Sequence, residues 1–356
     1  MDGSNGREMN FTLDGNSTFI GTSCISSRYE FIVFMIVLVT IGICGNFAFM
    51  YVVITVKSMH TAVNWFFTNL SCADTLYLIT HLFTSCIKLS PDYAVVQRSP
   101  VFGTVTSLAD GIMLCTSIFT VAAISIERYL AISNPLKAHQ LTGTKRIVKI
   151  TVAIWVISIL FNIPEALKYA TNYDSQTQVI LLSITALFQI ITFIISLIIV
   201  VATNLATVAR YRQNLKIIAS ANDSDMSQKK ISRHEGQVLW ACIGVSAIFL
   251  ICATPTIYRL TILVLMWHSV IRGSFISGAH FCIFLDMSLV LESINSIINP
   301  FVYNATSSRC RRAFRQALDC KRSCCGGTGA YGGKYHSNKY LSAKYMNGEA
   351  TCSVTL

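Results

Sequence analysis

Charged residues are scarce in this chain of 356 residues: they make up 13% of it, about half of the ~25% that is usual in soluble domains. Hydrophobic residues make up 53%, and this balance indicates an integral membrane protein. Acids are the rarer charge, with 17 Asp and Glu against 28 Lys and Arg. The cations fall in short clusters between apolar runs and form no patch interleaved with exposed aromatics, so we expect no nucleic-acid partner.

Other signals are missing too. The start of the chain has no basic segment followed by a short apolar core, so we expect no cleaved signal peptide. No constellation of metal ligands or nucleophiles is evident and His81 stands alone in its apolar segment, so we expect no enzyme. Nothing resembles the inverted repeats with paired broken helices of transporters, which leaves a seven-span transporter as a remote alternative.

Seven apolar segments, each near or beyond the ~20 residues that cross a bilayer, organise the chain. They run approximately over 31–56, 63–87, 102–130, 147–168, 178–209, 237–266 and 276–303. We therefore expect an all-α membrane protein, a seven-transmembrane-helix bundle spanning 30–304. An extracellular tail (1–29), an amphipathic cytoplasmic helix 8 (305–319) and a disordered cytoplasmic tail (320–356) should flank the bundle.

Charge and short motifs predict the orientation and the modifications. With the N-terminus outside, 21 of the 28 Lys and Arg lie on the inner side, which favours a plasma-membrane protein with a cytoplasmic C-terminus. Sequons predict glycosylation at Asn10 and Asn16. Arginines between 309 and 315 should meet anionic lipid, and three cysteines just beyond are placed for palmitoylation: Cys320, Cys324 and Cys325. The last four residues loosely suit a PDZ groove.

The stretch from Ser125 to Ala131 closes the third apolar segment with an adjacent acid and arginine, Glu127 and Arg128. Charges in lipid are costly, so this pair must lie at an aqueous edge or face inward. Taken alone, the pair fits an interfacial anchor better than it fits a functional site.

Six motifs stand in order along the segments. They are Gly45-Asn46, Asn69-Leu-Ser-Cys-Ala-Asp74, Glu127-Arg128-Tyr129, Trp155, Phe249-x-x-Cys252-x-x-Pro255 and Asn299-Pro300-Phe-Val-Tyr303. Together they resemble the rhodopsin-like (class A) G-protein-coupled receptors over about residues 30–320. The resemblance implies a receptor that binds an extracellular ligand and activates heterotrimeric G proteins, with arrestin as a partner of a phosphorylated tail.

The resemblance also implies roles for the matching residues. The G-protein switch would consist of Glu127, Arg128, Tyr129, Leu136, Glu235, Asn299, Pro300 and Tyr303, with Arg128 held by Glu127 in the inactive state. An allosteric sodium ion would bind among Asp74, Ser117, Asn295, Ser296 and Asn299; a hydrated network without an ion is the alternative. We expect no other cofactor. Activation would involve Ile118, Phe249 and Pro255.

The chain departs from the family pattern at its outer end. Gly103 stands where a cysteine usually opens the third span, and residues 169–178 contain no cysteine either. We therefore expect a different link, between Cys24 and Cys282, with Cys24 to Cys86 as the rival pairing. The sixth-span tryptophan of the family is replaced by Ala253.

The ligand prediction depends on charges near the outer end. Asp110 lies eighteen residues, five helical turns, before Arg128 and matches the aspartate that pairs with the ammonium of monoamines. The rest of an amine site is missing, and mixed charges favour a neuropeptide that contacts Asp110, Glu165, Arg259 and Glu292. A monoamine or other small-molecule (chemosensory-type) receptor is the alternative. Purely structural pairing of Glu292 with Asp110 or Arg259 would also account for these charges.

Overall fold

The computed structural model describes residues 29–97, 99–134, 144–170, 175–220, 226–268 and 278–325, and these contain no strand. The seven long helices among them are α1 (Tyr29–Thr55), α2 (Ala62–Lys88), α4 (Pro100–Ser133), α6 (Thr144–Ala170), α7 (Ser175–Ser220), α8 (Met226–Trp267) and α9 (Gly278–Thr306). Three shorter ones are η2 (Lys57–Met59), α3 (Tyr93–Gln97) and α10 (Ser308–Cys325). The predicted fold class, a seven-helix bundle followed by an amphipathic helix, is confirmed.

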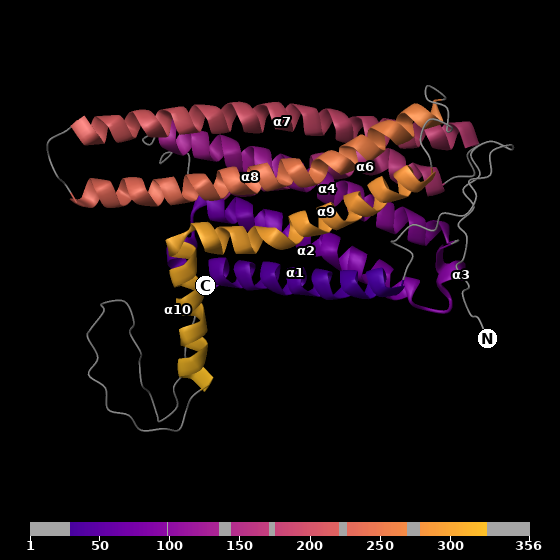
Figure 1. Cartoon of the computed structure of the whole chain (residues 1–356), viewed down its shortest axis with the longest axis horizontal. Coiled ribbons are helices and arrows are strands. Elements are labelled where there is room, and N and C mark those ends of the chain that lie inside the picture. Colours follow the sequence, from indigo (N-terminus) through magenta and orange to yellow (C-terminus); the bar gives the residue numbers. More distant parts are fainter. Residues whose placement is uncertain are drawn as a thin grey trace.

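The long helices lie side by side along the long axis of the molecule (Figure 1). The short helix α3 lies at one end of this bundle, and α10 crosses the other end almost at right angles to α9. We call these the α3 end and the α10 end. α7 and α8 project beyond the other helices at the α10 end, and α4 is central because it packs against α2, α6, α7 and α8.

Six of the described helices are long and apolar enough to cross a membrane: α1, α2, α4, α6, α7 and α8. α9 bears Asp286, Glu292, Asn295 and Asn299 along its length. Asp286, Asn295 and Asn299 are all buried, so these polar groups face the other helices and not lipid. Hydrocarbon tolerates a helix of this kind when its polar side chains are enclosed by protein.

Local sequence signals account for several helix ends and bends. The Thr61 hydroxyl caps α2 by accepting a hydrogen bond from the Asn64 backbone N–H. Proline opens α4, where its missing N–H costs nothing. Three other prolines lie inside helices: Pro164 in α6, Pro255 in α8 and Pro300 in α9. Membrane helices tolerate interior prolines because neighbouring groups satisfy the freed carbonyls.

α10 packs its apolar face on the bundle. Cys310, Ala313 and Ala317 are buried in the main core, at the spacing of one helix face. Arg309 donates to the backbone carbonyl of Ser58, and Arg311 donates to the last carbonyls of α9. These two arginines therefore bind protein backbone, which differs from the prediction that all the arginines between 309 and 315 meet anionic lipid.

Candidate functional site

The main cavity lies in the half of the bundle nearer α3 and has a volume of about 470 Å³. Its walls come from α2, α4, α6, α7, α8 and α9, and its size is in the range of cavities that hold small ligands. Its apolar lining includes Met113, Leu114, Leu260, Leu263 and Leu289. Such walls lower the local dielectric, so the few charged groups among them exert strong fields.

The four residues predicted to bind a ligand all line this one cavity. Asp110 comes from α4, Glu165 from α6, Arg259 from α8 and Glu292 from α9. The sequence placed them near the same end of the protein; the helix packing brings them around a common space. The cavity thus combines three acids with a single arginine among its lining residues.

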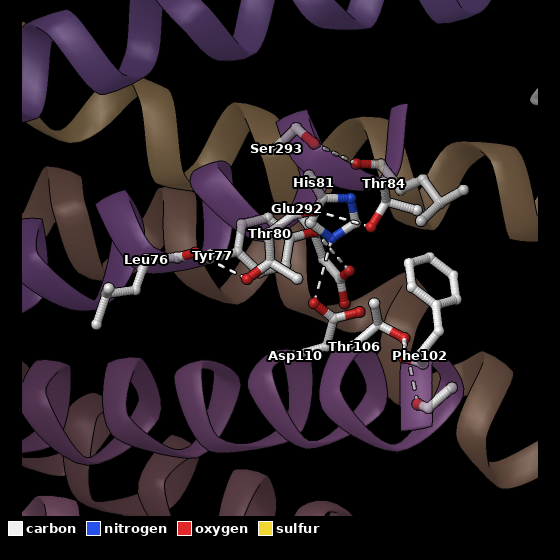
Figure 2. A network of polar contacts seen from close by, with 12 residues as sticks. Leu76, Tyr77, Thr80, His81, Thr84, Phe102, Thr106, Asp110, Glu292 and Ser293 are labelled. Carbon is white, nitrogen blue, oxygen red and sulfur yellow. Dashed lines mark hydrogen bonds and ion pairs between the residues drawn. The ribbon is translucent and has the colours of Figure 1, made fainter. Parts of the chain in front are cut away.

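Two residues of α2, Tyr77 and His81, contact two acids of the cavity, Glu292 and Asp110 (Figure 2). His81 Nε2 lies 3.4 Å from Asp110 Oδ1, close enough for an ion pair although the angles form no hydrogen bond. The Tyr77 hydroxyl donates to Glu292 Oε2 at 3.0 Å, and the Tyr77 and His81 rings pack with centroids 4.2 Å apart. Two carboxylates from α4 and α9 are therefore joined through two aromatic side chains of α2.

This network replaces the structural pairing considered for Glu292. Glu292 contacts Tyr77, and neither Asp110 nor Arg259 forms an ion pair with it within the described part of the chain. Our view of His81 as an isolated residue is wrong. The sequence did contain a signal for it, because Asp74, Tyr77 and His81 recur at the spacing of one helix face.

A polar contact between α6 and α7 forms a further part of the wall, which the sequence analysis missed. Gln189 Nε2 donates to Asn162 Oδ1 at 3.1 Å, and Asn162 Nδ2 donates to the Ser158 carbonyl at 2.8 Å. Gly111 of α4 lies directly against this pair, and a β-carbon there would clash with Asn162 Oδ1. The glycine is needed for the close approach of α4, as small residues often are between membrane helices.

The predicted sodium-pocket residues come from α2, α4 and α9. Asn299 Nδ2 donates to Asp74 Oδ2 at 2.8 Å, and Asp74 is only 1% exposed. Ser117, Asn295 and Ser296 line the deep part of the main cavity. The side-chain oxygens of Asn295 and Asn299 are buried without a hydrogen-bond partner. Buried oxygen donors beside a carboxylate form a donor set that suits a hard cation.

The predicted activation residues come from α4 and α8. Ile118 is fully buried, and Phe249 and Ala253 belong to the same core cluster while also lining the cavity. The small Ala253 side chain leaves room that an indole would occupy. The Pro255 ring is half-buried within α8, one turn below Arg259.

At the α10 end, Glu127 forms an ion pair with Arg146 and none within 4 Å with Arg128. That Glu127 holds Arg128 in the inactive state stays a prediction. Glu127 Oε2 accepts a hydrogen bond from Arg146 Nη2 of α6 at 3.1 Å, and Glu127 is 5% exposed. Consecutive residues of a helix point about 100° apart, so Glu127 and Arg128 face different neighbours. Tyr129 follows on the half-buried side of α4.

Arg128 points instead toward α8. Its Nε is buried without a hydrogen-bond partner, and its guanidinium interacts electrostatically with Glu127 and Glu235, although it forms no ion pair within 4 Å with either. Nearby, the Tyr303 ring stacks on Phe67 at 4.1 Å and packs against Phe49 at 4.7 Å. The Tyr303 hydroxyl is buried and unpaired.

Several predicted sites cannot be placed. Asn10, Asn16, Cys24 and Leu136 lie outside the described residues, as does the tail beyond 325. Cys282, Cys320, Cys324 and Cys325 belong to described helices, but the positions of their side chains are not described. Cys86 is a free thiol among the described residues, and the rival link between Cys24 and Cys86 is not tested because Cys24 lies outside them. The link between Cys24 and Cys282 and the palmitoylation sites stay predictions.

Comparison with known proteins agrees with the helix arrangement. Residues 45–303 match the family described as 7 transmembrane receptor (rhodopsin family). This range begins at the first of the six motifs and ends at Tyr303, the last residue of the sixth. Somatostatin receptor type 4 of Rattus norvegicus is 25% identical over 301 residues, which cover 80% of this chain and 71% of the rat protein.

Proposed function

Because the chain belongs to the rhodopsin family of seven-transmembrane receptors, we propose that it binds an extracellular peptide in the main cavity and activates a heterotrimeric G protein. The observation that supports this most strongly is the gathering of Asp110, Glu165, Arg259 and Glu292 around one space. A volume of about 470 Å³ admits one or two residues of a peptide, so the remainder would lie over the α3 end.

The acidic side of the cavity favours a ligand with a basic group. Asp110 keeps 45% of its side chain exposed despite its contact with His81, so a cation can still approach it. The rat relative is by its name a receptor for the peptide somatostatin, which agrees with a peptide ligand here. A monoamine is the second candidate because Asp110 alone can pair with a small ammonium ion.

We place the α3 end outside the cell and the α10 end in the cytoplasm. The excess of Lys and Arg on the C-terminal side of the spans supports this orientation under the positive-inside rule. Arg128 would then face the G protein, with Glu235 as its acidic neighbour and Asn299, Pro300 and Tyr303 as the adjoining part of the switch.

We propose a sodium ion at Asp74, held with oxygens of Ser117, Asn295, Ser296 and Asn299. The support is the set of buried, unpaired amide oxygens beside the Asp74 carboxylate. A cation that binds only one of two receptor states shifts the equilibrium toward that state. Because Ser117, Asn295 and Ser296 also line the main cavity, the ion would lie directly below the ligand.

A panel of peptides and amines applied to cells, with cAMP and calcium as the readouts, tests the function. We expect a peptide to activate the receptor and Arg128→Ala to abolish nucleotide exchange on the G protein while ligand binding and surface expression persist. Arg315→Ala, at an exposed arginine of α10, is the matched control. Undiminished signalling by Arg128→Ala would disprove the switch role and favour the alternative, in which Arg128 is an interfacial anchor. A response to amines alone, lost in Asp110→Asn, would favour the second candidate.

A further inference from the structure

Arg259 is the unusual charge of the main cavity. It is the only Lys or Arg among the lining residues, and it extends from α8 toward a space that otherwise bears acids. No hydrogen bond or ion pair joins it to another described residue, and its Nε is buried without a partner. A buried hydrogen-bond donor that lacks an acceptor lowers the stability of the protein. Such a donor in a cavity therefore favours a ligand that supplies the acceptor.

Thr256 lies one turn before Arg259 on the same face of α8. Its hydroxyl is also buried without a partner, and the residue is 2% exposed and lines the cavity. A threonine within a helix usually donates to the carbonyl four residues earlier, as Thr254 and Thr261 do on either side. Thr256 lacks that bond, so its hydroxyl remains available to the cavity.

We propose that Arg259 and Thr256 form an anion subsite that binds a carboxylate of the ligand. The planar guanidinium matches a carboxylate with two parallel hydrogen bonds, and the hydroxyl adds a third donor. Asp110 would meanwhile hold a cation of the same ligand on the opposite wall. The ligand end that enters the cavity is therefore zwitterionic, and this inference rests on the proposed function.

The alternatives within the protein are weaker. Glu165 and Glu292 are the other acids of the cavity, but neither forms an ion pair with Arg259 among the described residues, and Glu292 accepts from Tyr77. A single arginine with one hydroxyl is also a small donor set for a phosphate, which proteins usually bind with clusters of cations. The carboxylate can come from the C-terminus of a peptide or from an acidic side chain.

Thermal unfolding of the full-length receptor in lipid nanodiscs tests the subsite without any need for a G protein. The probes, each at 10 mM, are acetyl-Lys-Phe with a free carboxylate, the same dipeptide as its C-terminal amide, and acetyl-Lys-Phe-Glu amide. The variants are Arg259→Met and Thr256→Val. Tyr258→Phe is the matched control, because Tyr258 belongs to the same turn but is 45% exposed on the membrane side and packs on Phe284.

We expect the free acid to raise the Tm of the wild type by at least about 2 °C more than the amide does. Arg259→Met should remove this difference, Thr256→Val should reduce it, and Tyr258→Phe should preserve it. Stabilisation by the Glu-containing amide would assign the carboxylate to a side chain, and its absence would assign it to the C-terminus. Without ligand, Arg259→Met should melt at or above the wild-type Tm because it removes an unpaired cation.

Three outcomes would overturn the subsite: equal effects of all three probes on the wild type, no stabilisation by any probe at 10 mM, or a lower Tm of ligand-free Arg259→Met. The last would make Arg259 a structural residue. These outcomes are independent of nucleotide exchange. A receptor that activates a G protein but responds equally to all three probes would disprove the subsite and leave the proposed function intact.

Discussion

His81 Nε2 lies 3.4 Å from Asp110 Oδ1, so the carboxylate proposed to meet the ligand already faces a titratable group of the protein. This contact is an ion pair only when the imidazole carries a proton. The other charged groups that act on His81 are Glu292 and Lys88, and the Tyr77 ring packs against it. A proton on His81 and a cation of the ligand therefore compete for Asp110.

We expect a cationic ligand to bind more weakly at pH 6 than at pH 8, because protonated His81 occupies Asp110. Loss of one ion pair of about 1.4 kcal/mol would lower the affinity about tenfold. His81→Asn removes the proton-dependent charge and should flatten the pH profile. Competition binding with the agonist found in the ligand screen measures both.

His60 provides the control for this experiment. It lies at the α10 end, exposed and packed against Trp65, and His60→Asn should leave the pH profile unchanged. An unaltered pH dependence in His81→Asn would contradict the competition between the proton and the ligand, and would direct attention to the ligand's own titration.

Gly111→Ala should destabilise the receptor. The added methyl group would clash with Asn162 Oδ1 and approach Gln189 Nε2 to 2.9 Å, so α4 must move away from α6 and α7. Overpacking of this kind costs about 1–3 kcal/mol, and we expect a lower Tm together with weaker ligand binding. Gly244→Ala is the control, because its methyl group would meet Val302 at an ordinary 3.6 Å. Equal Tm values for the two variants would contradict this view of Gly111.

The helix bundle and the charged residues that line the cavity could be predicted from the sequence for a physical reason. Lipid requires long apolar segments, so the seven helices are marked by composition. Charged residues within such segments must face protein or water, so Asp110 and Glu292 had to point inward. Helical spacing then placed both toward the α3 end.

The side-chain contacts between helices could not be predicted in this way. The rotation of α2 and α6 about their own axes decides that Glu127 meets Arg146 and that Asp110 meets His81. The sequence fixes the face of each residue relative to its own helix, but the packing of neighbours fixes the rotation. Asn162 and Gln189 were missed because a single amide in a span gives no indication of its partner.

Cys310 should resist alkylation and acylation in the folded receptor. Burial raises the pKa of its thiol to about 12, although the nearby Arg311 opposes this rise. At pH 8 almost no thiolate is present, and the thiolate is the reactive form. We expect N-ethylmaleimide at pH 8 to modify the exposed Cys86 but not Cys310 until the protein is denatured, as peptide mass mapping would show. Modification of both cysteines at similar rates would contradict the burial of Cys310.

Arg146→Ala should cost more stability than Glu127→Gln, because removal of the cation leaves a buried carboxylate unpaired. The double variant should lose less than the sum of the single variants, with a coupling energy of about 1–3 kcal/mol from the shared contact. Thermal unfolding in nanodiscs measures all three, and Lys145→Ala, at the exposed neighbouring residue, should change the Tm little. Strict additivity would mean that the 3.1 Å contact contributes nothing to the fold. A clear coupling would show that the contact between Glu127 and Arg146 joins α4 to α6.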